Sequence, residues 1–217
     1  QDDNNTFSRA VFRYDPGVNR WEQLNDFPVA GWKYGAVQHQ NRAFIIGGSP
    51  NYERTWSEVW EYDLKNYAWH QRASMPIPVI GAGIAGCDDR IYVFGGSRDE
   101  SEQVNAVQVY DLATDRWQVT GEMPAHLYFI TAVLQKDFIY VFGSRVWDAE
   151  LERWAPNHAV YRFNPLDGLW TQFSLAGPTA EASSPRHAVV VAGTIYLVEE
   201  VEPDLSTGSV LKLSGTY

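Results

Sequence analysis

The sequence IYVFGG at residues 91–96, followed by YDLATDRW at residues 110–117, decides the fold. The first stretch is an apolar run that ends in a glycine pair, and the second places a tyrosine seven residues before a tryptophan. Apolar β-branched and aromatic residues favour strands. A glycine pair lets a chain leave a strand through backbone angles that are closed to larger residues. The two stretches therefore predict short strands joined by turns.

Both motifs recur along the chain. The apolar run appears as AFIIGG, IYVFGG, IYVFGS and IYLVEE, beginning at residues 43, 91, 139 and 195. The aromatic motif appears as YDPGVNRW, YDLKNYAW, YDLATDRW and FNPLDGLW, beginning at residues 14, 62, 110 and 163. The first three copies of each motif keep a period of 48 residues. Self-similarity at a fixed period indicates a repeat architecture.

These motifs resemble the kelch repeat, in which a glycine pair follows an apolar strand and a Tyr-Asp pair precedes a Trp. The resemblance covers nearly the whole chain. It implies an all-β, kelch-type β-propeller, with one blade of four antiparallel strands per repeat around a central channel. The Tyr and Trp of each copy are expected to pack between adjacent blades, where large aromatic side chains stabilise the fold.

The repeat boundaries divide a single propeller domain at 1–217 into five pieces. We expect a half blade at 1–28, blades at 29–76, 77–124 and 125–177, and a half blade with an extra strand at 178–217. The first piece supplies an outer strand pair and the last an inner pair, so together they predict a closed ring of four blades. The stretch GSVLKLSG at 208–215 resembles another third strand. If it fills that place, the chain is instead an open arc, part of a larger ring, or half of a two-chain ring.

The composition limits the classes of partner. The formal net charge is −10, which argues against nucleic acid because a phosphate backbone needs a basic surface. No apolar run reaches the roughly 20 residues that span a bilayer, so no membrane insertion is expected. The single cysteine, Cys87, excludes a disulfide framework. The compartment stays open, although Asn4-Asn5-Thr6 fits a glycosylation pattern and slightly favours secretion.

In kelch propellers, partners usually bind the face made by the loops between the second and third strands and between consecutive blades. These loops differ in length and content here, whereas the strands repeat. Aromatic and arginine side chains are favoured anchors in interfaces. The residues that we expect to bind a partner are Trp32, Lys33, Tyr52, Arg54, Trp56, Arg98, His126, Tyr128, Arg145, Trp147, Arg186 and His187.

Lys33 and Arg186 lie where the family often carries an arginine at the start of the inner strand. The other two units have Gly81 and Phe129 near that place. The basic ring of acidic-peptide binders is therefore incomplete, which weakens any transfer of that specificity.

Catalytic and metal signals are weak. The recognised catalytic motifs are absent, and the acidic stretch EEVEPD at 199–204 matches no known calcium loop, so it is expected to be a solvated loop. We predict no catalytic residue, metal or cofactor, and expect a non-catalytic binding scaffold with a protein or glycan partner, leaving a homodimer open. The alternative is a sugar-processing enzyme of the sialic-acid mutarotase kind.

Overall fold

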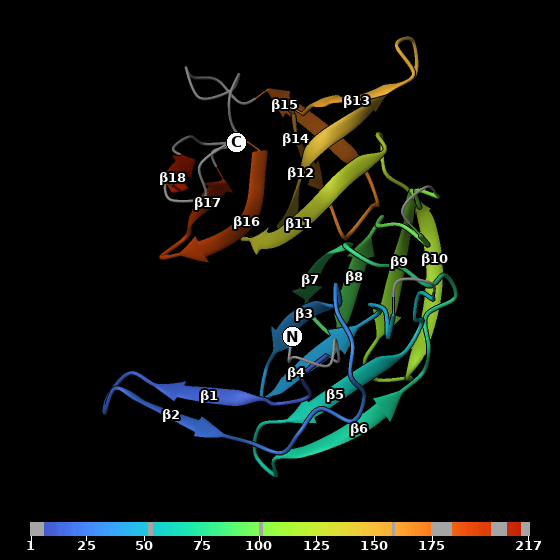
Figure 1. The fold of residues 1–217 in the computed structure, drawn as a ribbon. Helices are drawn as coiled ribbons and strands as arrows, with labels where there is room; N and C mark the ends of the chain where they lie inside the picture. Colours follow the sequence, from blue (N-terminus) through green and yellow to red (C-terminus); the bar gives the residue numbers. More distant parts are fainter. Residues whose placement is uncertain are drawn as a thin grey trace.

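The computed structural model describes residues 7–51, 54–99, 102–157, 159–174, 184–200 and 208–213. Every regular element within these ranges is a β-strand. Three sheets of four or five strands and one of three strands stand around a common centre in an arc (Figure 1). The all-β class and the blade architecture predicted from the repeats are confirmed.

In the first three blades the strands follow chain order from the centre outward, and neighbours are antiparallel. The first blade consists of β3 (Gly35–His39), β4 (Arg42–Ile46), β5 (Val59–Asp63) and β6 (Ala68–Arg72). The second consists of β7 (Gly83–Cys87), β8 (Arg90–Phe94), β9 (Ala106–Asp111) and β10 (Arg116–Glu122). The third consists of β11 (Leu127–Gln135), β12 (Phe138–Asp148), β14 (Ala159–Phe163) and β15 (Trp170–Ser174), with β13 (Arg153–Pro156) paired to the end of β12.

The two ends of the chain do not combine into a fourth blade. One sheet holds β16 (Ser184–Val191), β17 (Thr194–Glu200) and β18 (Gly208–Leu213), while β1 (Phe12–Asp15) and β2 (Arg20–Gln23) form a separate ribbon. β18 pairs with β17 along its length, and so fills the place that ring closure would give to β1. Closure into four blades is therefore not seen among the described residues, which form the open arc (Figure 1). A strand that follows β17 closely in sequence pairs with it at a smaller loop-closure cost than a strand from the other terminus.

The ribbon of β1 and β2 packs against the first blade as the outer half of a preceding blade would. The guanidinium of Arg13 donates to the hydroxyl of Tyr67 at 2.8 Å, and the indole of Trp69 donates to the carbonyl of Asn25 at 3.3 Å. Phe27 lies buried between them, with its ring 4.9 Å from that of Trp69. The ribbon is thus held without inner strands of its own.

The hydrophobic core lies between blades. Between the first and second blades, Phe44 and Val59 pack with Ile91 and Tyr110. Two further clusters follow along the arc, one between the second and third blades and one joining the third blade to β17. Each blade is therefore stabilised through its neighbours, as expected for a repeat architecture.

The glycine pairs act as the sequence predicted. Gly47 and Gly48 have φ of +65° and +95°, and a Cβ at Gly47 would lie 2.3 Å from the carbonyl oxygen of Val79 in the next blade. In the third copy the second glycine is Ser144, and the chain does not turn there. It continues as β12 to Asp148 and folds back as β13, and this hairpin projects from the third blade (Figure 1).

Candidate functional site at the channel mouth

The same backbone bend lies near the start of the inner strand in each of the first three blades. Lys33, Gly81 and Phe129 have φ of +51°, +63° and +50°. The amide of Gly81 donates to the carbonyl of Lys33 at 3.3 Å, and the amide of Ile130 donates to the carbonyl of Gly81 at 3.4 Å. These bonds run from blade to blade around the mouth of the channel. Ten non-glycine residues among those described have a positive φ, eight of them in turns, and Lys33 and Phe129 are the two at this mouth.

A hollow of about 620 Å³ opens at this mouth, lined by the four inner strands and the segments that precede them. Its wall consists mainly of glycine, alanine and isoleucine. The polar groups on it include Lys33, Thr131 and His187, which come from the first blade, the third blade and β16. A smaller hollow beside it, of about 30 Å³, brings Lys33 together with Tyr128 and Phe129. The arrangement is concave, with a few polar groups on an apolar wall, as small-molecule and peptide sites often are.

Beside the mouth, four rings of the third blade form a continuous group that we call the aromatic patch. It consists of Tyr128, Phe129, Trp147 and Trp154. The ring of Tyr128 lies 4.2 Å from that of Phe129 and 5.6 Å from that of Trp154, and Trp154 lies 5.5 Å from Trp147. Trp147 and Phe129 keep 40% and 39% of their surface exposed. The patch therefore presents large apolar surface to solvent on a paired hairpin.

Trp32 and Lys33 form a second aromatic and basic group on the same rim. The ammonium of Lys33 lies 4.3 Å from the centre of the Trp32 ring, and the ring of Phe7 stacks on Trp32 at 6.1 Å. A cation over an aromatic face is attracted by the ring electrons. Trp32 is half-buried, so this pair fixes the position of the Lys33 charge at the mouth.

The predicted residues on the loops of the first two blades differ in how much of their surface is exposed to a partner. Arg54 and Arg98 are exposed, and Arg98 pairs with Glu102 at 2.6 Å. The hydroxyl of Thr55 donates to the carbonyl of Arg98 and so joins the two loops. Trp56 is only 7% exposed, because it packs beneath Gly31, and it offers little surface to a partner.

The remaining predicted residues lie on the third blade and β16. His126 and Arg145 are exposed, and the amide of Trp147 donates to the carbonyl of His126 at 3.1 Å. Arg186 lies in β16, where the register shifts between Pro185 and His187. Tyr52 lies outside the described residues, as do residues 201–204 of the acidic stretch.

Two residues of the mouth were missing from the predicted set, Phe129 and Trp154. Phe129 occupies the position of Lys33 two repeats later; the alignment of repeats placed it there, but it was not counted as a binding residue because it is not basic. Trp154 lies seven residues after Trp147 and opposite it in the β12–β13 pairing. The side chain of Asp148 accepts from the amides of Glu150 and Leu151 in the turn between them, so the sequence carried a signal for this hairpin.

Comparison with known proteins places the fold in a family. A family model described as the KLHDC2/KLHL20/DRC7 Kelch-repeats domain matches residues 33–199. The chain belongs to the kelch-repeat family. The solved structure of YjhT is similar to this kelch chain with a TM-score of 0.76, covering 97% of it and 78% of the YjhT chain at 12% sequence identity. A likeness at that identity shows the fold alone.

No curated protein sequence matches the chain. Within the part of the chain that the structure describes, no helix is long and apolar enough to cross a membrane.

Proposed function

We propose that this kelch propeller is a non-catalytic interaction module that holds a protein partner on the channel-mouth face. The exposed aromatic patch carries the proposal, because aromatic side chains on a rigid scaffold are preferred interface anchors. Trp147 and Phe129 expose about two-fifths of their surface beside the channel, on paired strands. Kelch domains in general mediate protein interactions, and this supports the assignment.

The charges around the patch support a partner of mixed polarity. Arg145 precedes Trp147 on β12 and lies opposite Tyr128, and Lys33 and His187 line the adjoining hollow. Protein interfaces commonly combine an aromatic centre with a polar rim, and arginine is enriched in them along with the aromatic residues. We therefore expect an apolar segment of the partner to cover Trp147 and Phe129, with acceptor groups directed at the basic rim.

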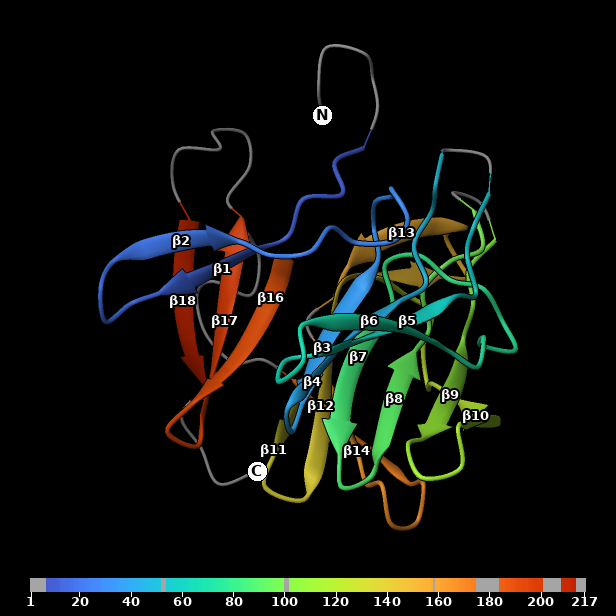
Figure 2. The ribbon, with the colours of Figure 1, turned by 90° about the horizontal axis from the view of Figure 1, so that it is seen from below.

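The experiment starts from the protein that co-purifies with the native chain. Its affinity is measured for the wild type and for Trp147→Ala, and we expect the variant to bind about tenfold more weakly or worse, a loss of about 1.4 kcal/mol. The control is Leu166→Ala, since Leu166 is 87% exposed in the turn between β14 and β15, at the other end of the molecule (Figure 2). Equal binding by both variants would refute the mouth as the binding face.

The rival function is a sugar-processing enzyme of the sialic-acid mutarotase kind. The hollow of about 620 Å³ favours it, since Lys33, Thr131 and His187 converge on an apolar wall there. The test follows the interconversion of sialic-acid anomers by NMR. Turnover that Arg186→Ala or His187→Ala abolishes would replace the interaction module as the proposed function.

A further inference from the structure

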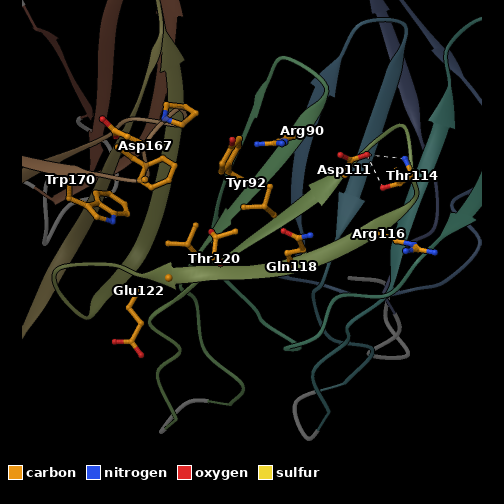
Figure 3. Close-up of a pocket in the computed structure, with 16 residues that line it drawn as sticks. Arg90, Tyr92, Asp111, Thr114, Arg116, Gln118, Thr120, Glu122, Asp167 and Trp170 are labelled. Carbon is orange, nitrogen blue, oxygen red and sulfur yellow. Dashed lines mark hydrogen bonds between the residues drawn. The ribbon is translucent and has the colours of Figure 1, made fainter.

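A second hollow, of about 640 Å³, lies between the second and third blades, away from the channel. Figure 3 shows side chains of β8, β9 and β10 on one side, including Tyr92, Gln118 and Thr120, and Asp167 and Trp170 of the third blade across from them. We call this space the seam pocket. No residue predicted for the channel mouth lines it.

The corresponding seam between the first and second blades is filled. There the buried carboxylate of Glu61 accepts from the guanidinium of Arg72 at 2.9 Å and pairs with Arg42 at 3.6 Å. One period of 48 residues later, Val109 and Thr120 stand in place of Glu61 and Arg72. The third position is unchanged, because Arg90 corresponds to Arg42. The buried ion group is thus lost from the second seam, and a basic group remains beside it.

The hydrogen bonds that close the first seam are also lost. In the first seam Trp117 donates to the carbonyl of Ala73 at 2.8 Å, and Asp115 accepts from the amide of Ala73 and the hydroxyl of Tyr110. In the third blade Phe163 and Gly168 occupy the places of Tyr110 and Asp115, so the bonds of that hydroxyl and carboxylate cannot form.

The register of β10 against β9 also shifts, between Val119 and Gly121. This bulge lies where β10 faces the third blade. The seam pocket is the space that these substitutions and the bulge leave.

The lining carries both signs of charge and uncharged polar groups. Asp111 is the cross-strand partner of both Arg90 and Arg116, so the three form one row across β8, β9 and β10. Hydrogen bonds from the hydroxyl and amide of Thr114 lower the pKa of Asp111, which keeps it ionised. Further along the same side of β10, the amide of Gln118 and the hydroxyl of Thr120 add groups that donate and accept.

The rest of the lining is apolar and rigid. Val107, Val109 and Tyr92 supply its apolar surface. Trp170 stands against it, with its ring 4.9 Å from that of Phe163 and 5.7 Å from that of Phe94. An indole held by two neighbouring rings is a fixed flat surface.

We infer that the seam pocket binds a neutral saccharide of one or two rings. Sugar hydroxyls both donate and accept, so they can satisfy Asp111, Gln118 and the arginines together, while the carbon face of a sugar ring can cover Trp170. An anion would be repelled by the carboxylates of Asp111 and Asp167. A purely apolar ligand would bury the polar groups without hydrogen-bond partners, which costs free energy. The volume lies within the roughly 300–1,000 Å³ of small-molecule sites.

The test titrates the chain with lactose, maltose and cellobiose at millimolar concentrations, with glucuronate and inorganic phosphate for comparison. Binding is followed by calorimetry and by amide NMR shifts of β9 and β10. Gly121→Trp fills the pocket, because a Cβ at Gly121 meets no atom within 4 Å. We expect it to weaken disaccharide binding at least about tenfold, and Gln118→Ala to weaken it by a smaller factor. His70→Ala, at the corresponding position of the filled first seam, should bind like the wild type.

Several results would overturn the inference. They are the absence of disaccharide binding, binding that survives both Gly121→Trp and Gln118→Ala, shifts confined to the channel mouth, and binding of glucuronate or phosphate alone. Gln118→Ala keeps the test decisive if Gly121→Trp does not fold. Affinity for the mouth partner should be unchanged in both variants, so the outcome here is independent of the interaction module.

Discussion

The aromatic pair of each repeat packs in a similar way but in different surroundings. Tyr110 and Trp117 pair with ring centres 5.0 Å apart, and Tyr14 and Trp21 of the ribbon do the same. Tyr110 is 1% exposed, whereas Trp21 is 65% exposed because no blade covers that side of the ribbon. The motif therefore sets the local pairing, and the neighbouring blade determines how much stability the pair contributes.

This difference predicts unequal effects of truncation. Trp117→Ala should lower the free energy of unfolding by about 3–5 kcal/mol, as expected for a large aromatic in a packed seam. It removes packing against the core between the first two blades as well as the hydrogen bond to Ala73. The measurement is urea denaturation, with Trp21→Ala as the matched control, for which we expect a loss below about 1 kcal/mol. Similar losses in the two variants would contradict the role assigned to the seam.

At the scale of strands, the sequence predicted what local chemistry decides. The apolar runs became the second strand of each blade, and the glycine pairs became the turns that follow. The Asp of the aromatic motif also acts locally, since Asp63 and Asp111 accept from amides two and three residues ahead. Longer-range features could not be predicted in this way. The seam pocket depends on contacts between segments of two blades, which no short motif encodes.

The glycine turn gives a prediction at this scale. Gly47→Ala should destabilise the chain by roughly 1–3 kcal/mol, since it forces a residue with a Cβ into the left-handed region. The new Cβ would also lie 2.3 Å from the carbonyl oxygen of Val79, so backbone must move. Gly121→Ala is the control, because a Cβ there meets no atom within 4 Å, and it should be neutral or slightly stabilising. Thermal unfolding of the two variants checks the difference, and an unchanged Gly47→Ala would show that this turn tolerates a side chain.

Across the whole molecule, periodicity predicted the propeller because two independent motifs share one spacing. Three of the residues proposed for the site, Lys33, Tyr128 and His187, reach the rim from different blades. Trp56 does not reach the rim, because it lies under Gly31. That position depends on how its loop folds back, which residue type alone does not determine. Blade number was the least predictable feature. It depended on whether β18 or β1 pairs with β17, and both segments have the pattern of a third strand.

The open arc leaves two uncovered faces, which predicts self-association. Phe12, Tyr14 and Trp21 are exposed on the ribbon, and Val189, Val191 and Val210 are exposed on the sheet of β16–β18. Exposed apolar clusters of this kind mark association surfaces. In a pair of copies, the ribbon of one chain can cover the sheet of β16–β18 of the other. We expect light scattering to give twice the chain mass of 24.6 kDa. Trp21→Ser combined with Val210→Ser should restore the single mass, whereas Leu166→Ser, on an exposed turn away from both faces, should leave the dimer intact. A wild-type mass of one chain would mean that both faces stay open to solvent or meet within one molecule.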